Sequence, residues 1–477
     1  MIKARVSLLL PILFTLPSCN TSEKKESAKP NIVLIFADDL GWTGLSSFGS
    51  NYYETPNIDK LVEKGMRFTN AYSAATVCAP SRGSLLSGQY SPRHGVLRVT
   101  HVPRARGNEN LYKYTQPEGS TFSNDIITIP EILKGGGYAT GMFGKWHLFP
   151  VTPGEQGFDE WIESHGKHFN FATQPITEVP EGAYLTDFMA DHAINFIKKH
   201  AEEPFFLYLP DFLVHKPLEA KTHLIEKFNP KETVGNQKDP VYAAMTTSLD
   251  STVGRIYNTL VELSLLENTL IIFMSDNGAN ARTKPDGAAF LDKGVSDNVP
   301  LRDGKGLMYE GGIRVPYVFV WKNRILPGTV SNDPIIGIDI YPTLAEIAGI
   351  DLPENQVIDG ESILPLLFSE VDKLPLRPLF WHYPNYGPVS VRNHKVNYSY
   401  IPTDVIRYGD YKLLEFYHGE TEHLELYNLK EDLSELHNLT EKMPEKTEEL
   451  YQMLCKWREE MNAEFPKLNE DFSLEGN

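Results

Sequence analysis

The segment Ile32-Val33-Leu34-Ile35-Phe36-Ala37-Asp38-Asp39 joins an uninterrupted apolar run to two carboxylates. Runs that are apolar throughout are typical of strands buried on both faces of a sheet. Three later segments have the same form: Ala139 to Phe143 runs into Gly144-Lys145-Trp146-His147, Phe205 to Leu209 leads toward His215, and Leu270 to Met274 runs into Asp276-Asn277-Gly278. We therefore predict four core strands, each followed by polar residues.

Helical patterns lie between these strands. Thr55-Pro56 opens one that ends at Gly65, Thr128 with Pro130 opens a second, and Thr186 opens a third, on which His192 has only a core-facing interpretation. Strands that alternate with helices predict an α/β fold, with a large, mixed, mostly parallel sheet flanked by helices. Because ligands of open α/β sheets bind beyond the carboxyl ends of the strands, the polar clusters should converge on one crevice.

Four of the polar residues suit a metal ion. Asp38, Asp39, Asp276 and Asn277 offer only oxygen ligands, which favours Ca²⁺ or Mg²⁺ over zinc. The same residue pairs are typical of a helix cap and a turn, and the residues alone leave that interpretation open.

Cys78-Ala79-Pro80-Ser81-Arg82-Gly83 opens another predicted helix, with Pro80 at its first position and Ser87-Gly88 as its end. Cys78 then lies at a helix N-terminus, where free backbone N–H groups and the helix dipole favour an anion. A buried structural cysteine is the alternative interpretation.

The pattern Cys78-x-Pro80-Ser81-Arg82 resembles the motif of type I sulfatases, in the alkaline-phosphatase-like superfamily, and other segments similar to that family follow in the same order from Asn31 to about Ile350. The resemblance implies that a maturation enzyme oxidises Cys78 to formylglycine, whose hydrate is the nucleophile. It also implies one divalent metal, Ca²⁺ or Mg²⁺, held by Asp38, Asp39, Asp276, Asn277 and an oxygen of the modified Cys78.

The resemblance assigns further roles in the same way. The segment from Gly304-Lys305-Gly306 to Val315-Pro316 is similar to the one whose lysine binds sulfate, and Lys145 is implied to contact sulfate too. His215 matches the histidine that protonates the leaving oxygen, and His147 is the base expected for release of sulfate. Arg82 adds positive charge, while Glu310 and Arg314 are expected to pin the Lys305 loop. From the residues alone, a solvated lysine and structural histidines are equally open interpretations.

The expected activity is hydrolysis of sulfate esters on polysaccharide or glycosaminoglycan-type carbohydrates, with small aryl sulfates as a second substrate class. A phosphodiesterase or phosphonate monoester hydrolase of the same superfamily is one alternative, and a non-enzymatic glycan-binding lipoprotein is another. A net charge of -18 argues against nucleic acid as a partner. Arg104, Arg106 and His382, together with residues 165–168, could contact a sugar, although solvated surface loops carry the same residue types.

The chain of 477 residues divides into a catalytic domain over residues 30–370 and a C-terminal subdomain over 371–477. We predict a smaller antiparallel sheet in the subdomain, followed by a helix from Glu441 to Phe465. Its strands are expected at Leu379 to His382, Val405 to Arg407, Tyr411 to Phe416 and His423 to Tyr427.

The N-terminus reads as an export signal over residues 1–19, because Lys3 and Arg5 precede an apolar run from Val6 to Leu16. Cys19 suggests a lipid anchor, but Pro17 departs from the small residue usual before such a cysteine, so plain secretion stays open. Residues 20–29 are expected to form a disordered linker. The expected location is the periplasm or the cell surface, with no disulfide, since only Cys455 remains beside Cys19 and Cys78.

Overall fold

The computed structural model describes residues 29–99, 120–281, 296–386, 401–417, 423–461 and 466–470, and the backbone alone for 389–392 and 395–398. The predicted export signal, Cys19, most of the predicted linker, Arg104 and Arg106 lie outside the described residues.

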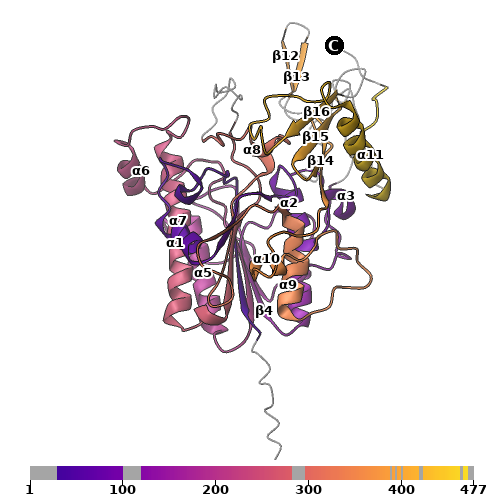
Figure 1. Ribbon diagram of the computed structural model, residues 1–477. Coiled ribbons are helices and arrows are strands. Elements are labelled where there is room, and N and C mark those ends of the chain that lie inside the picture. Colours follow the sequence, from indigo (N-terminus) through magenta and orange to yellow (C-terminus); the bar gives the residue numbers. More distant parts are fainter. Residues whose placement is uncertain are drawn as a thin grey trace, which may run out of the picture.

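An eight-stranded sheet in the order β5-β4-β6-β1-β7-β8-β2-β9 forms the centre of the molecule (Figure 1). Strand β8 is antiparallel to its neighbours β7 and β2, and the other neighbouring pairs are parallel. The strands are β1 (Asn31–Ala37), β2 (Met66–Phe68), β4 (Ala139–Gly144), β5 (Glu160–Glu163), β6 (Phe205–Pro210), β7 (Thr269–Ser275), β8 (Tyr317–Trp321) and β9 (Thr329–Ser331). The short strand β3 (Ala71–Tyr72) pairs separately with β10 (Ile335–Ile336).

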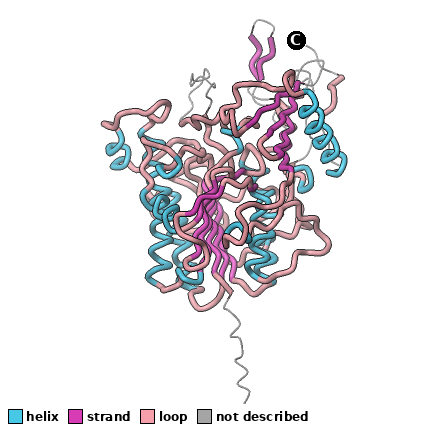
Figure 2. The backbone as a smooth tube through the Cα atoms, in the orientation of Figure 1, coloured by secondary structure: helices cyan, strands magenta, loops and turns pink. Residues whose placement is uncertain are grey.

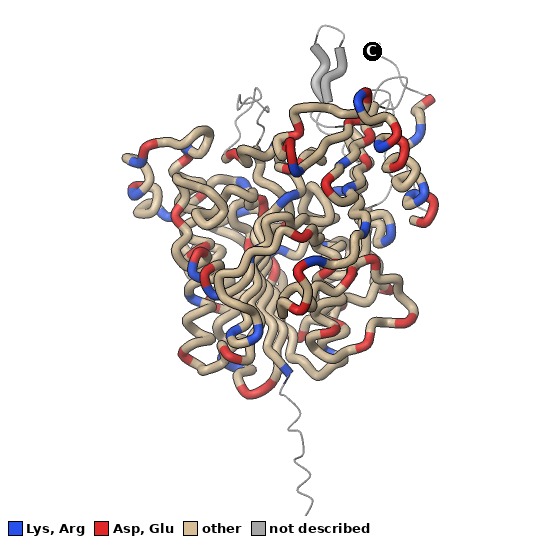
Figure 3. The backbone as a smooth tube through the Cα atoms, viewed as in Figure 1, with Lys and Arg blue, Asp and Glu red and all other residues tan. Residues whose placement is uncertain are grey.

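Strand β1 shows why this sheet is buried on both faces. Val33 and Ile35 belong to the hydrophobic cluster on one face, whereas Ile32, Leu34 and Phe36 belong to the cluster on the other, and all five side chains are 0% exposed. Strands β1, β6, β7 and β8 carry no charged residue, in contrast to the outer helices and loops (Figure 3). The sheet therefore forms the middle of three layers (Figure 2), which confirms the predicted α/β fold.

Helices cover both faces of the sheet. One face carries α1 (Pro56–Lys64), α5 (Leu185–Lys199), α6 (Thr222–Phe228) and α7 (Pro240–Glu262). The other carries α2 (Cys78–Ser87), α4 (Ile129–Gly135), α9 (Ile340–Ala348) and α10 (Leu364–Leu367). Shorter helical turns are η1 (Ser46–Phe48), α3 (Ser91–His94), η3 (Gly154–Gln156), η4 (Leu266–Asn268), α8 (Glu310–Ile313) and η5 (Gly337–Asp339).

The predicted helix starts are close to those observed. Thr128 begins α4 through a capping box, in which its backbone N–H donates to Glu131 at 2.8 Å. The sequence pattern predicts Pro80 at the first helical position. Helix α2 begins at Cys78 instead, so Pro80 occupies the third position. The first turn tolerates this proline because its N–H groups have no partner within the helix.

The C-terminal part of the chain forms a four-stranded antiparallel sheet, as predicted. Its strands, in the order β11-β14-β15-β16, are β11 (Pro378–Tyr383), β14 (Thr403–Tyr408), β15 (Tyr411–Phe416) and β16 (His423–Asn428). Strands β12 (Val389–Arg392) and β13 (Lys395–Tyr398) form a separate hairpin. Helix α11 (Pro444–Met461) begins three residues later than predicted, while residues 462–465 of the predicted span lie outside the described residues. Its Trp457 stacks on Phe380 of β11 with ring centroids 4.8 Å apart.

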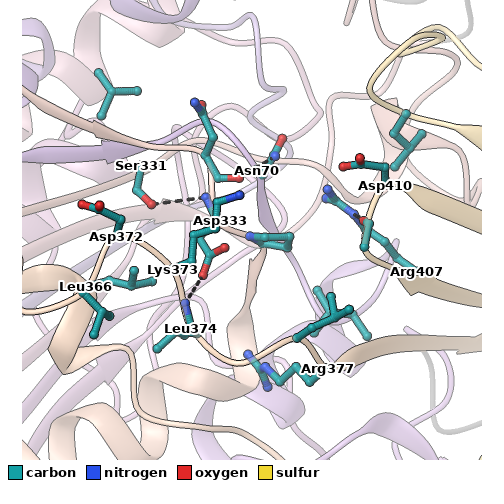
Figure 4. A pocket seen from close by; sticks show the side chains of 18 of the residues that line it. Asn70, Ser331, Asp333, Leu366, Asp372, Lys373, Leu374, Arg377, Arg407 and Asp410 are labelled. Carbon is teal, nitrogen blue, oxygen red and sulfur yellow. Dashed lines mark hydrogen bonds between the residues drawn. The ribbon is translucent and has the colours of Figure 1, made fainter.

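A cavity of about 990 Å³ lies at the junction of the two sheets (Figure 4). Its wall includes Ser331 at the end of β9, Asp333 beyond it, Leu374, and Arg407 near the end of β14. Asp333 accepts a hydrogen bond from the backbone N–H of Leu374 at 2.8 Å, which fixes the segment between the two sheets. Arg314, which was expected to pin the Lys305 loop, lines this cavity, whereas the predicted metal ligands and Arg82, Lys145, His147, His215, Lys305 and His382 do not.

Within the described residues, the structure contains no helix that combines the length and the apolar character needed to span a membrane.

Candidate active site

The polar ends of β1 and β7 lie side by side. These strands pair in parallel with Ala37 opposite Ser275, so the residues that follow them, Asp38-Asp39 and Asp276-Asn277, meet at the carboxyl edge of the sheet. The backbone N–H of Asp39 donates to Oδ1 of Asp276 at 3.1 Å. Asp39 has a φ of 60°, a left-handed conformation that turns the chain at the strand end. The predicted convergence of the two acidic pairs is therefore present.

Cys78 lies over this acidic edge as the first residue of α2. Its Sγ is 3.4 Å from Oδ1 of Asp38, 3.9 Å from Oδ1 of Asp39 and 3.1 Å from Nζ of Lys305. Burial, with Asp276 and Asp38 nearby, raises the pKa of the Cys78 thiol well above its ordinary value. The unmodified thiol is therefore held protonated, and it is completely buried.

Arg82, one turn further along α2, ties the strand ends together. Its guanidinium lies 2.7 Å from Oδ2 of Asp276 and 3.5 Å from Oδ2 of Asp38, and it donates to the carbonyl of Lys145 at 2.8 Å. The face of Phe36 in β1 lies 5.3 Å from the guanidinium carbon. Arg82 is 0% exposed, and these contacts fix α2 against the ends of β1, β4 and β7, while its Nε has no hydrogen-bond partner among the described residues.

The buried Lys145 and the partly buried Lys305 neutralise the carboxylates. Nζ of Lys145 lies 2.6 Å from Oδ2 of Asp38, and Nζ of Lys305 lies 2.5 Å from Oδ1 of Asp39. Burial alone would raise the pKa of Asp38, but Lys145 and the surrounding cations hold it well below its usual range. Asp276 differs, because burial and the neighbouring Asp38 raise its pKa to about 6. The edge of the sheet thus combines three carboxylates with cations from α2 and two loops.

The loop that carries Lys305 packs backbone against backbone. The N–H of Lys305 donates to the carbonyl of Ala279 at 2.9 Å, directly after the Asp276-Asn277 pair. Four glycines line this contact, and an added Cβ at any of them would overlap a backbone oxygen of a neighbouring segment: Gly278, Gly304, Gly311 and Gly312. These glycines allow Lys305 to approach the carboxylates closely.

His215 reaches the cluster from the loop after β6. Its Nε2 lies 3.7 Å from Oδ2 of Asp39, while Nδ1 lies 2.5 Å from the carbonyl of Lys216 and must donate a hydrogen bond to it. Nε2 is therefore the nitrogen that can take up or release a proton toward the cluster. The backbone of the loop is fixed to β1, because the N–H of Asp38 donates to the carbonyl of Leu213 at 2.8 Å.

An aromatic stack orients the His215 ring, and no local signal in the sequence predicted it. Phe212 stacks on His215 with ring centroids 5.0 Å apart, and His168 also stacks on Phe212, with ring centroids 4.8 Å apart. Nε2 of His168 also lies 2.9 Å from the carbonyl of His215. His168 was a candidate sugar contact, but it is 0% exposed and supports the His215 loop.

His147 lies in the same region but makes fewer contacts with the site than His215. It follows Lys145 with a φ of 67°, and its ring lies 5.9 Å from the ring of His165. Its Nδ1 is buried and has no hydrogen-bond partner among the described residues. Burial, reinforced by Lys145 and Arg82, lowers the pKa of His147 well below its ordinary value.

The donors at this edge could hold a metal ion. Ligand atoms of Asp38, Asp39, Cys78 and His215 all lie within 4.8 Å of one another. The amide nitrogen of Asn277 donates to Oδ1 of Asp39 at 2.8 Å, and its Oδ1 is buried without a partner among the described residues. Rotation of the amide by 180° would turn this oxygen toward Asp39. A cation bound beside Asp39 could then be coordinated by it.

His382 has a different environment from the other predicted residues. It lies in β11 of the C-terminal sheet and is 2% exposed, with Nδ1 2.5 Å from Oδ1 of Asp404. Its role as a substrate contact stays a prediction, as do those of Arg104 and Arg106, which lie outside the described residues.

Comparisons with known proteins agree with this arrangement. A family model for sulfatases matches residues 30–350, and a model for the C-terminal region of N-sulphoglucosamine sulphohydrolase matches residues 303–464. A sulfatase of Formosa agariphila is 33% identical over 493 residues, which cover 87% of this chain and 84% of that protein. The N-acetylgalactosamine-6-sulfatase of Homo sapiens is 31% identical over 379 residues, covering 74% of this chain and 68% of that protein.

A solved structure shares the whole architecture. The crystal structure of Ps i-CgsB in complex with k-i-k-neocarrahexaose superposes with a TM-score of 0.72 and 29% identity. The match covers 90% of this chain and 92% of that chain, so it includes both sheets.

Proposed function

The chain belongs to the sulfatase family of the alkaline-phosphatase-like superfamily and is a sulfuric ester hydrolase, and we propose that it removes sulfate from carbohydrates with a nucleophile built on Cys78. One observation carries this proposal. Cys78 starts α2 within 3.4 Å of an Asp38 oxygen and 3.1 Å of the Lys305 ammonium, so a nucleophile at this position faces a cation and an acidic pocket at once.

The site residues divide the work of the reaction by their charges. Lys145 and Lys305 are placed to hold the sulfuryl oxygens, because their ammonium groups are the cations nearest to Asp38 and Asp39. Arg82 is buried and pairs with Asp276 and the carbonyl of Lys145, which supports a role in orienting α2 and Asp276. Together with a divalent cation these groups would leave the site positive, as a sulfate ester monoanion requires.

The proton of the leaving group is assigned to His215. The carbonyl of Lys216 fixes the proton on Nδ1, so Nε2 is the atom that exchanges a proton with the substrate oxygen. The Phe212 stack holds the ring in place for this transfer. His147 remains the proposed base for sulfate release. Its buried Nδ1 has no hydrogen-bond partner among the described residues, which supports a contact with the bound substrate.

Two groups complete the proposed site. Formylglycine, formed from Cys78 by a maturation enzyme, would supply a geminal diol as nucleophile and a route for the release of sulfate. Asp38, Asp39, Asp276 and Asn277 would hold one Ca²⁺, with Mg²⁺ as the second choice, and the ion would activate a hydroxyl and offset charge. The oxygen-rich donor set supports the choice of a hard cation.

The carbohydrate substrate is supported by the relatives. N-acetylgalactosamine-6-sulfatase and the neocarrahexaose complex both concern sugars, and the regions matched cover most of this chain. Export, and a lipid anchor on Cys19 that would hold the enzyme at the periplasmic or outer surface, are supported by the sequence of residues 1–19 alone.

The substrate test uses the full mature chain, produced together with a formylglycine-generating enzyme. Sulfate released from sulfated galactose-type and glycosaminoglycan oligosaccharides is measured by ion chromatography, beside a phosphodiester and a phosphonate monoester. We expect sulfate release from at least one oligosaccharide at a higher kcat/KM than phosphorus ester cleavage. Cleavage of the phosphorus esters without sulfate release would favour the alternative activity.

A further inference from the structure

The loop that presents Lys305 runs from Arg302 to Glu310, and its middle is held by the catalytic domain. The N–H of Lys305 donates to Ala279, and the N–H of Gly306 donates to the carbonyl of Thr76 at 3.0 Å. These two bonds fix the height of the loop over the carboxylates. The ends of the loop are held from two sides: the side-chain amide of Asn298 in the catalytic domain donates to the carbonyls of Asp303 and Gly311 at 2.8 Å and 3.1 Å, and the C-terminal part contacts Arg302 and Glu310.

One residue of the C-terminal part contacts both ends of this loop. The side chain of Arg302 donates to the carbonyl of Glu435 at 2.9 Å. The backbone N–H of Glu310, on the other side of Lys305, donates to the Glu435 carboxylate at 2.7 Å. Glu435 lies beyond β16, 125 positions from Glu310 in sequence, and α8 lies next to this sheet in Figure 1.

The surroundings of Glu435 hold it firmly. It is 0% exposed with a φ of 54°, and its Oε1 lies 2.8 Å from Nζ of Lys412 in β15. The same ammonium lies 3.0 Å from Oε1 of Glu310. Tyr72 and Arg314 complete the Glu310 carboxylate at 2.7 Å and 3.3 Å. Loss of any one partner would leave an uncompensated buried charge, so this arrangement is costly to disturb.

We infer that Glu435 is a positioning residue for Lys305: it clamps both ends of the loop, and through the loop it sets where the ammonium meets the substrate sulfate. The inference rests on the proposed function, in which Lys305 binds sulfate. It gives the C-terminal sheet a part in the reaction without contact to the reacting atoms. Small displacements of such a group are costly, since a misplacement of about 1 Å can lower a rate on the order of 10²-fold.

The clamp itself is tested without any activity measurement. Hydrogen exchange of the segment 302–311 is followed by mass spectrometry in the full chain, in Glu435→Ala and in Glu435→Gln. We expect exchange to be faster on the order of tenfold in the alanine variant and about threefold in the glutamine variant, which keeps the volume but loses the ion pair with Lys412. Glu431→Ala, an exposed glutamate of the same segment, is the matched control and should leave exchange unchanged.

Wild-type exchange rates in the Glu435 variants that fold would overturn the clamp. This outcome is independent of whether the protein releases sulfate. An absence of sulfate release by the wild type would contradict the proposed function, and the exchange result would still decide the clamp.

A double-mutant cycle tests the consequence for the reaction. Glu435→Ala should lower kcat/KM for an aryl sulfate about tenfold when Lys305 is present, and less than about twofold in a Lys305→Ala background. A purely structural role would give the same loss in both backgrounds, because general destabilisation does not depend on Lys305. Equal losses in the two backgrounds would therefore overturn the inference. A loss that occurs only when Lys305 is present supports it.

Discussion

Nζ of Lys305 lies 3.1 Å from Sγ of Cys78, although 227 positions separate the two residues in sequence. The contact arises because the Lys305 loop crosses the N-terminus of α2 at the carboxyl edge of the sheet. The same ammonium pairs with Asp39 at 2.5 Å, so one cation touches both the proposed nucleophile and a proposed metal ligand. Changes on either side of this contact should therefore affect activity more than stability.

Replacement of Cys78 should abolish turnover. Cys78→Ala and Cys78→Ser are expected to lower sulfate release on the order of 10³-fold or more, because neither side chain can form the aldehyde hydrate. The serine variant could survive only if the maturation enzyme also oxidises serine. Activity is measured on an aryl sulfate, with Cys455→Ser in α11 as the matched control. A Cys78→Ala variant that keeps more than a few per cent of activity would contradict the mechanism.

The acidic edge should bind about one divalent cation per chain. Elemental analysis of the purified protein is expected to find Ca²⁺ or Mg²⁺ and no stoichiometric zinc. Asp39→Asn should lose the metal and lower activity on the order of 10²-fold or more, since a carboxylate ligand becomes a neutral amide. Asp297→Asn, another buried aspartate, should retain the metal. Two zinc ions per chain would favour a phosphatase-type site.

His215 should matter in proportion to how poorly the leaving group departs. His215→Ala is expected to lower kcat on the order of 10²-fold for a sugar sulfate, whose alkoxide needs a proton. The loss should be much smaller for nitrophenyl sulfate, because the phenolate leaves unaided. His223→Ala, an exposed histidine of α6, serves as control. Equal losses on both substrates would assign His215 to sulfate binding.

Arg104, Arg106 and His382 should affect sugar recognition if they border the substrate. Their alanine variants are expected to lower kcat/KM for a sulfated oligosaccharide about ten- to a hundredfold while sparing an aryl sulfate. His382→Ala should also lower the free energy of unfolding, because the buried Asp404 loses one of its partners, at 2.5 Å, and keeps only Tyr417 and Arg458 among those described. Unchanged oligosaccharide kinetics in all three variants would remove these residues from the substrate site.

Asp250 should make stability depend on pH. It accepts the N–H groups of Asn57 and Ile58 at the start of α1, at 2.9 Å and 2.8 Å, and burial raises its pKa to about 6. A raised pKa in the folded state favours the protonated form, so its contribution is complete below the ordinary value of 3.8 and is lost as pH rises through about 6.

Urea unfolding at pH 5 and pH 8 checks this expectation. Relative to Asp250→Asn, which cannot ionise, the wild type should lose on the order of 1 kcal/mol between these pH values. Asp191→Asn, whose carboxylate is 62% exposed, should show no comparable difference. A pH-independent gap between wild type and Asp250→Asn would contradict the expectation.

The sequence predicted the centre of the site because its signals are local. The apolar runs of β1 and β7 and the acids that follow them are adjacent in the chain, so the strand ends could be identified from either segment alone. The parallel register then made their meeting a geometric consequence. The start of α2 could be predicted to within two residues from Pro80, which is common in a first helical turn.

Other features had no local signal. The run Tyr317–Trp321 reads as a buried strand, but nothing within it indicates that β8 is antiparallel to β7. His382 occupies a polar and aromatic stretch that suggested a sugar contact, and its partner Asp404 comes from the facing strand β14. In the sequence, Glu435 cannot be distinguished from the many surface acids. The loop residues that it contacts, Arg302 and Glu310, lie more than a hundred positions away.

The glycines at Gly278, Gly304, Gly311 and Gly312 limit how this enzyme can diverge. At these glycines the backbone of one segment packs directly on the backbone of another. Any larger residue would overlap a backbone oxygen, so point substitutions cannot change this contact in small steps. The part of the site that binds the sulfate group is thereby constrained, while segments outside this junction can change in sequence. New sugar specificities should therefore arise by remodelling the surrounding loops, with the sulfate-cleaving edge inherited intact.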